Sequence, residues 1–164
     1  MIDTALASNG PTALRFPRAT LPTLPPQFRP PSAPIEGARW LKRAQSPRLA
    51  IVAIGPLVVA ALEAAGAAAD WSVLDARFIL PLDREALTEA AAAGSVLTVE
   101  EGSVRGGFGS SVEELFSEQG LRVKLSALGL PPRFVRHGDA KRQRIELGLD
   151  AAGIRRAALQ LLES

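Results

Sequence analysis

Two neighbouring segments decide the fold: WSVLDARFILPLDREAL (71–87) and SVLTVEEGSVRGGFGSSV (95–112). Apolar runs alternate here with polar turns and with segments of helical character. This order predicts a strand, a helix, a second strand and then a glycine turn that opens a further helix, which is typical of an open α/β sheet. Such a sheet would place Arg77, Glu100 and Glu101 just past strand ends, where ligands and partner domains usually meet these folds.

The same alternation continues toward both ends of the chain. Leu49–Ile54 is a continuous apolar run bounded by turn residues, as expected of a strand covered on both faces. We expect strands at 38–43 (an edge), 49–54, 71–76, 95–99 and 122–127, and helices at 55–69, 83–93, 109–119, 139–147 and 150–163. Asp83 and Asp150 are the expected N-caps of two of these helices. The pattern predicts an α/β three-layer sandwich around a mostly parallel five-stranded sheet, with 38–43 as a candidate antiparallel edge.

The first part of the chain has a different composition. Most of the 13 prolines precede residue 48, and the segment TLPTLPPQFRPPSAP (20–34) is too rich in proline for a helix or a central strand. A short helix at 2–8 and a strand at 12–16 are expected before it, but they cannot form a core alone. The expected regions are 1–19, the end of a truncated preceding domain; 20–37, an extended linker; and 38–164, the α/β domain.

Composition excludes several classes of protein. The chain has no cysteine, which excludes disulfides, zinc-thiolate sites and cysteine nucleophiles, and its single histidine and lack of tyrosine leave few acid-base candidates. No apolar run reaches the roughly 18 residues of a membrane span. The net charge of +2 comes with no basic run interleaved with aromatic residues, so nucleic acid is not an expected partner. We therefore expect a cytoplasmic protein that binds neither membrane nor nucleic acid.

Two arginines are candidate ligands of a phosphate group. Arg77 follows one predicted strand, and Arg15 lies at the end of another, with Arg18 beyond Pro17. Taken singly, each is more often a surface residue or a salt-bridge partner. Together, at the ends of neighbouring elements, Arg15 and Arg77 would form a phosphate clamp.

The glycine-rich turn at 102–111 leads into a helix, where free backbone N–H groups can bind an anion. It lacks the residues of a P-loop and the spacing of a dinucleotide fingerprint, which favours a tight turn that packs the helix closely on the sheet. One of Glu100 and Glu101 would cap this turn or bind a partner's cation, and the other would be solvated. Adjacent strand residues point to opposite faces, so the two do not form an acid/base pair. His137 lies alone in a turn, which favours a structural role.

A set of ordered motifs carries a family resemblance. They are NGPTALRFPR (9–18), LDARFILPLD (74–83), TVEEG (98–102), GGFGS (106–110), LGLP (128–131) and GLDAAGI (148–154). In this order they closely resemble the C-terminal end of the 1-deoxy-D-xylulose-5-phosphate synthases, which belong to the thiamine-diphosphate-dependent transketolase family. The middle motifs are shared in weaker form with transketolases and with the β subunits of 2-oxo acid dehydrogenases.

The resemblance implies a part of a homodimeric enzyme with three α/β domains per chain. That enzyme condenses pyruvate with glyceraldehyde 3-phosphate, releases CO2, and serves isoprenoid precursor, thiamine and pyridoxal biosynthesis. Arg15 and Arg77 match arginines that bind the phosphate of glyceraldehyde 3-phosphate, and residues 1–19 match the end of the pyrimidine-binding domain.

The motifs for thiamine diphosphate and Mg²⁺ have no counterpart in these residues. The resemblance therefore implies that the cofactors bind elsewhere in the full-length enzyme. It also implies that this chain alone binds no cofactor, contributes no catalytic residue and is inactive. Two alternatives remain: the interaction subunit of a split transketolase-like or 2-oxo acid dehydrogenase enzyme, and an anion-binding regulatory module.

Overall fold

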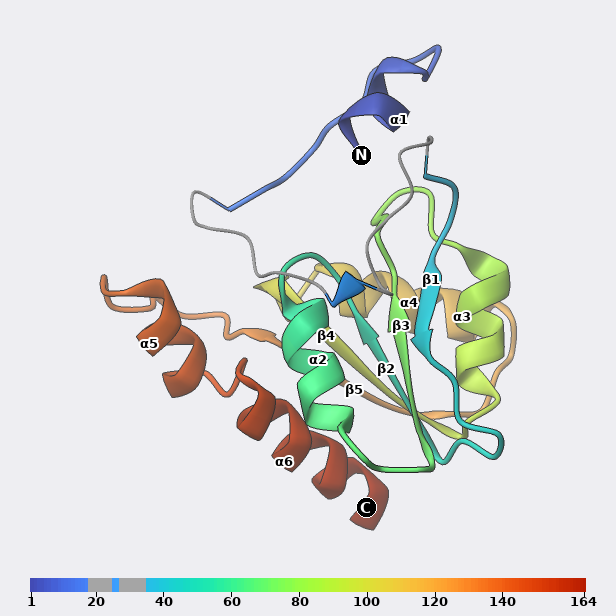
Figure 1. The fold of residues 1–164 in the computed structure, drawn as a ribbon, viewed down its shortest axis with the longest axis vertical. Coiled ribbons are helices and arrows are strands. Elements are labelled where there is room, and N and C mark those ends of the chain that lie inside the picture. The colour runs from blue at the N-terminus through green and yellow to red at the C-terminus, as the bar shows by residue number, and fades with distance from the viewer. Residues whose placement is uncertain (18–24, 27–34) are drawn as a thin grey trace.

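The computed structural model describes residues 1–17, 25–26 and 35–164, and in these ranges it confirms the predicted alternation of strands and helices (Figure 1). The elements are α1 (Ile2–Leu6), β1 (Arg39–Lys42), β2 (Leu49–Ala53), α2 (Leu57–Ala65), β3 (Trp71–Asp75), α3 (Arg84–Ala91), β4 (Ser95–Ser103), α4 (Phe108–Glu118), β5 (Lys124–Leu130), α5 (Ala140–Glu146) and α6 (Ala151–Glu163).

The strands form a five-stranded sheet in the order β1-β3-β2-β4-β5. The pairs β3–β2, β2–β4 and β4–β5 are parallel, whereas β1 pairs with β3 in the antiparallel sense. This confirms the predicted mostly parallel sheet and its antiparallel edge strand. Every residue of the central strand β2 is buried, as its unbroken apolar sequence predicts.

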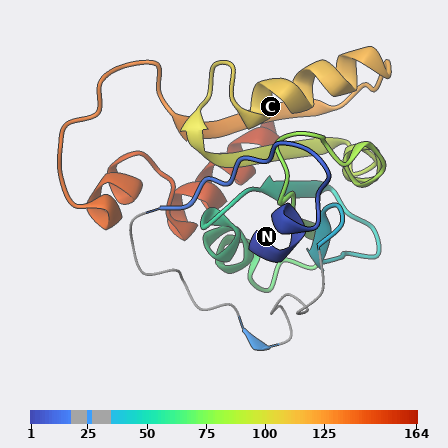
Figure 2. The same ribbon diagram turned by 90° about the horizontal axis from the view of Figure 1, so that it is seen from above.

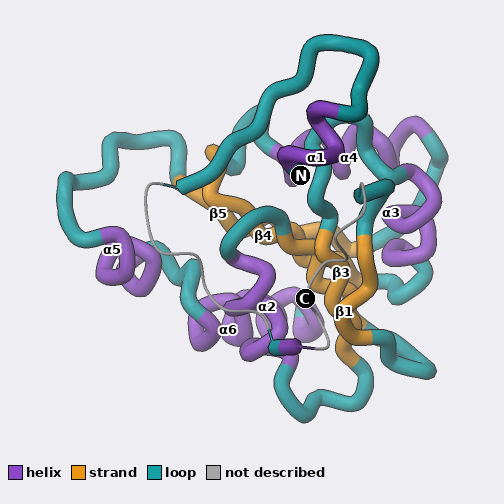
Figure 3. Tube along the Cα trace, turned by 45° about the horizontal axis from the view of Figure 1, so that its top comes forward, coloured by secondary structure: helices purple, strands orange, loops and turns teal. Residues whose placement is uncertain are grey.

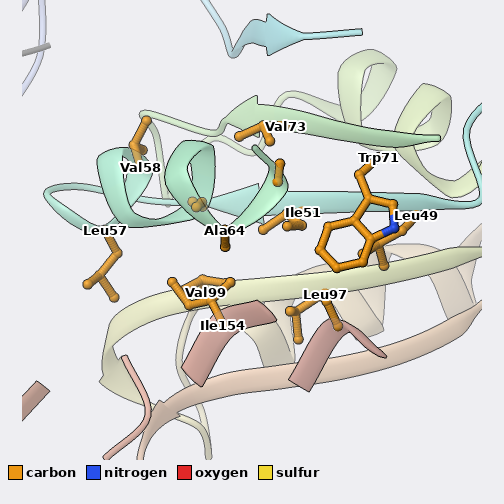
Figure 4. Close-up of a cluster of buried hydrophobic side chains, with 14 of the residues drawn as sticks. Leu49, Ile51, Leu57, Val58, Ala64, Trp71, Val73, Leu97, Val99 and Ile154 are labelled. Atoms are coloured by element: carbon orange, nitrogen blue, oxygen red, sulfur yellow. The ribbon is translucent and has the colours of Figure 1, made fainter. Parts of the chain in front are cut away.

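Helices cover both faces of the sheet and complete the three layers. One core cluster lies beneath α2 and α6, and the other beneath α3 and α4. Figure 4 shows the first cluster, in which Ile51, Val73 and Leu97 from three different strands pack with Ala64 of α2 and Ile154 of α6. Burial of these apolar side chains on both faces holds the parallel strands together.

Aspartate side chains begin three of the helices. Asp83 accepts a hydrogen bond from the backbone N–H of Ala86, and Asp150 accepts one from that of Gly153, each at 3.0 Å. Asp139 caps α5 in the same way. The N-caps expected at Asp83 and Asp150 are confirmed, because a short carboxylate satisfies an N–H group that the first helical turn leaves free.

Several boundaries differ from the prediction. α2 ends at Ala65 rather than near Ala69, because Gly66 adopts a φ of 41° and turns the chain. β4 continues to Ser103, four residues beyond the expected end, so that Glu100 and Glu101 lie within the strand. β5 begins two residues later than expected and runs to Leu130.

The strand expected at 12–16 is wrong: residues 11–17 are extended but are not assigned to a strand. A strand requires a ladder partner, and none pairs with this segment among the described residues. The helix expected at 2–8 is present as α1, none of whose residues is buried. Most of the predicted linker at 20–37 lies outside the described residues.

The N-terminal segment lies at the carboxyl edge of the parallel strands. The backbone N–H of Ile35 donates to Thr4 Oγ1 at 2.7 Å, which joins α1 to the residues preceding β1. Figures 1 and 3 place α1 beyond the edge of the sheet that carries the loop from β3 to α3. Arg77 follows β3 at this edge.

Candidate functional site

Arg77 follows β3 at the carboxyl edge and adopts a backbone conformation that residues other than glycine rarely take, with a φ of 58°. The backbone N–H of Phe78 donates to the carbonyl of Ala76 at 2.6 Å, so Arg77 is the centre of a three-residue turn. Such turns with a positive central φ are rare and strained, at a cost of about 1–3 kcal/mol. The surrounding structure, not local preference, therefore holds Arg77 in this turn.

Asp75, the last residue of β3, provides part of that support. Its Oδ2 lies 3.4 Å from Arg77 Nε, and the backbone of Arg77 also interacts with the carboxylate. Only 18% of the Asp75 side chain and 12% of the Arg77 side chain are exposed. Arg39 of β1 stands opposite Asp75 in the antiparallel ladder. The Asp75 carboxylate thus lies between two arginines, at a position that is largely shielded from solvent.

Two opposing effects act on the Asp75 carboxyl. Burial raises its pKa and is the larger effect, while the charge and hydrogen bonds of Arg77 and the charge of Arg39 lower it. The net direction is upward, so the ionised carboxylate is less favourable in the folded chain than in water. At neutral pH the charged Asp75 therefore lowers the stability of the fold.

Arg15 lies on the extended segment 11–17, where its side chain is exposed. Arg77, by contrast, is nearly buried against Asp75. Among the described residues, no hydrogen-bond acceptor contacts both Arg15 and Arg77. Arg18 lies outside the described residues. The clamp formed by Arg15 and Arg77 stays a prediction.

Glu100 caps the glycine turn. Its Oε2 accepts from the backbone N–H of Phe108 at 3.0 Å and its Oε1 accepts from that of Gly109 at 2.9 Å, and the residue is 4% exposed. The first N–H groups of α4, which would bind an anion, are therefore occupied by this chain's own carboxylate. This argues against the anion-binding module.

The glycines of this turn are required by close packing. A Cβ added at Gly107 would lie 2.1 Å from the carbonyl oxygen of Ser103, and one at Gly109 would lie 2.7 Å from Thr98 Oγ1 and 2.8 Å from the Cβ of Ala127. The interpretation of the turn as a device that packs a helix closely on the sheet is confirmed.

Glu101 is not solvated, contrary to the prediction for the second glutamate. Its Oε1 lies 2.7 Å from Arg144 Nε and 2.5 Å from an Nη of the same residue, and its side chain is 14% exposed. This ion pair joins α5 to β4. The sequence did not reveal it, because the two residues are 43 positions apart.

His137 is exposed in the loop between β5 and α5, which Figure 2 shows projecting away from the sheet. In the described ranges, no group of three or more His, Cys, Asp or Glu side chains could hold a metal ion. Within the same ranges, no helix combines the length and apolar character needed to cross a bilayer.

Comparison with known proteins decides the family. Residues 38–154 match the family model described as transketolase, C-terminal domain. The chain belongs to this family. The transketolase C-terminal domain thus accounts for the α/β sandwich and for most of the chain's length.

Within this family, the curated relatives that match the chain include several enzymes of one name. The 1-deoxy-D-xylulose-5-phosphate synthase of Myxococcus xanthus is 55% identical over 162 residues, which cover 99% of this chain and 28% of that protein. The synthase of the same name from Magnetococcus marinus is 44% identical over 169 residues, 99% of this chain and 27% of that protein. The chain therefore spans little more than a quarter of the length of these relatives.

Solved structures agree on the fold. A split gene transketolase, described as an inactive β4 tetramer, is 30% identical with a TM-score of 0.74; the match covers 89% of this chain and 48% of that one. Transketolase from Leishmania mexicana is 20% identical with a TM-score of 0.54, over 77% of this chain and 18% of that one, and supports the fold alone.

Asp75 of this transketolase C-terminal domain was not among the residues predicted from the sequence to form the site. Its signal was nevertheless present, because a carboxylate two residues before an arginine at a strand end can interact with both the backbone and the side chain of that arginine. A charged residue that ends an otherwise uncharged strand is the feature that would have indicated it.

Proposed function

We propose that this chain is the C-terminal portion of a 1-deoxy-D-xylulose-5-phosphate synthase, which joins pyruvate to glyceraldehyde 3-phosphate with loss of CO2. Relatives of that name match 99% of the chain, up to 55% identity. The observation within the fold that best supports the proposal is the strained, nearly buried Arg77 at the carboxyl edge. Strained backbone that neighbouring residues maintain is often associated with function.

In this proposal, the domain binds the acceptor substrate and performs no bond-making step itself. Arg77, with Arg15, contacts the phosphate of glyceraldehyde 3-phosphate, because a guanidinium group recognises phosphate oxygens in a two-point manner that lysine does not reproduce. Thiamine diphosphate and Mg²⁺, which supply the chemistry on pyruvate, belong to the remaining domains. The enzyme is a cytoplasmic homodimer, and this domain contributes to the contact between subunits.

The test is Arg77→Ala and Arg15→Ala in the full-length enzyme, or in the assembled complex if the thiamine-binding part is a separate chain. The loss of a charge-assisted hydrogen bond should raise the KM for glyceraldehyde 3-phosphate about 10- to 100-fold. The KM for pyruvate should change less than about twofold, because pyruvate has no phosphate.

Arg48→Ala is the matched control, since Arg48 is exposed at the opposite, amino edge of the sheet beside Asp70. An equal rise in both Michaelis constants, or an effect of Arg48→Ala as large as that of Arg77→Ala, would sink the assignment of the clamp.

A second candidate is the separate C-terminal subunit of a split enzyme. It is favoured by the resemblance to the split gene transketolase. Purification of the chain from its own cells separates the two candidates: a distinct thiamine-binding polypeptide should co-purify in the split case, and a single longer polypeptide should be found otherwise.

A further inference from the structure

We propose that Asp75 is a positioning residue, which holds the guanidinium group of Arg77 by Nε so that its two terminal nitrogens present themselves to the phosphate of the substrate. This rests on the proposed function of Arg77. The role differs from that of a ligand, because Asp75 repels phosphate and acts only through Arg77.

The hydrogen bonding of Arg77 supports this division of its nitrogens. A guanidinium group carries five N–H donors, and only Nε donates to an acceptor among the described residues, the carboxylate of Asp75. Thr98 Oγ1 is, in the same ranges, the buried side-chain polar atom without a partner. If the terminal nitrogens of Arg77 were sealed in the interior, they too would be buried polar atoms without a partner. They therefore reach solvent, although most of the Arg77 side chain is covered.

The backbone supports the same conclusion. The backbone of Arg77, like its side chain, favours the charged form of Asp75, so one carboxylate acts on both the strained turn and the guanidinium group. The spacing of two residues permits this because a short carboxylate can reach the N–H group two positions later. A side chain fixed in this way loses little conformational freedom when it binds phosphate.

The arrangement carries two costs for the fold. It combines a positive φ at a residue other than glycine with a carboxylate whose burial disfavours its charged form. Arg77 favours the ionised carboxylate, but the burial of Asp75 outweighs this effect on its pKa. A pair that orients an arginine for a ligand can keep an unfavourable charge, as functional sites commonly do.

The experiment is Asp75→Asn in the full-length enzyme, measured beside Arg77→Ala and the double variant. The asparagine keeps the shape of the side chain and removes its charge. We expect the KM for glyceraldehyde 3-phosphate to rise about tenfold with kcat and the KM for pyruvate within about twofold, as for weakening one charge-assisted contact. The double variant should resemble Arg77→Ala alone, because Asp75 acts through Arg77. Asp70→Asn, at the amino edge beside Arg48, is the matched control and should have no effect.

Each other result has a distinct meaning. An unchanged KM in Asp75→Asn, with a raised KM in Arg77→Ala, would overturn the role of Asp75 and leave the proposed function standing. A lower KM in Asp75→Asn would also overturn it, since Asp75 would then compete with the phosphate for Arg77. If Arg77→Ala leaves the KM unchanged, the proposed clamp is wrong and the positioning role falls with it.

Discussion

An acidic residue lies near a tight turn in each of two strands, Asp75 at the end of β3 and Glu100 within the last part of β4, yet the two acids do different things. Glu100 accepts two short backbone hydrogen bonds from the start of α4. Asp75 instead interacts with an arginine in a strained turn, and burial raises its pKa. The first arrangement satisfies groups that the fold would otherwise leave unpaired, whereas the second maintains an unfavourable conformation and an unfavourable charge.

The difference separates architecture from function at one edge of the sheet. The turn at 102–109 is explained completely by packing and helix capping, and it leaves no free donor at Phe108 or Gly109 for a ligand. The turn at Arg77 carries a positive φ, and no hydrogen-bond partner among the described residues takes its terminal guanidinium nitrogens, which remain for a ligand. A position near a strand end does not by itself identify a binding site. The hydrogen-bond donors that a turn leaves without a partner are what indicate one.

The packing of the glycine turn predicts a large loss of stability at Gly107. In Gly107→Ala the new Cβ would meet the carbonyl oxygen of Ser103 at 2.1 Å and both oxygens of Glu100 within 2.8 Å, so backbone must move. We expect the free energy of unfolding to fall by more than about 4 kcal/mol, measured by urea denaturation of the 164-residue chain.

Gly106→Ala is the matched control. Nothing lies within 4 Å of a Cβ at Gly106, and its φ of 67° should limit the loss to about 1 kcal/mol. Similar losses in the two variants would contradict the close-packing account of the turn.

The backbone strain at Arg77 predicts a smaller change in stability. Glycine adopts a φ of 58° without strain, whereas alanine does not. Arg77→Gly should therefore be more stable than Arg77→Ala by about 1 kcal/mol, although glycine normally weakens a fold. Thermal unfolding of the two variants measures the difference, and a less stable Arg77→Gly would mean that the turn is not strained.

Much of the fold could be predicted from the sequence. The apolar run of β2, the N-caps Asp83 and Asp150 and the alternation of strands with helices are local signals, and the structure confirms them. The strand at 12–16 was wrong because local pattern cannot supply a ladder partner. The continuation of β4 to Ser103 was missed because pairing with β5 overrides the low strand propensity of its glutamates and glycine.

Less of the candidate site could be predicted. The position of Arg77 at a strand end was visible, but its positive φ and its partner Asp75 were not, since strain and burial are properties of the folded chain. The ion pair between Glu101 and Arg144 was likewise invisible, because it joins distant segments. Charge partners of this kind depend on the tertiary arrangement and leave no periodic signal in the sequence.

The most direct test compares two amides of the same shape as the acids that they replace, Asp75→Asn and Glu100→Gln. The free energy of unfolding of the 164-residue chain is measured for each from neutral pH downward. The folded pKa of Asp75 is raised, so the penalty of its charge is full above that pKa and disappears as pH falls toward the ordinary aspartate value. Asp75→Asn should therefore equal or exceed the parent in stability at neutral pH, and any gain should vanish at acidic pH.

Glu100→Gln should lose about 1–3 kcal/mol at neutral pH, because its amide NH2 would face a backbone donor. A loss in Asp75→Asn as large as that in Glu100→Gln would contradict the account, since Asp75 would then be a stabilising part of the architecture.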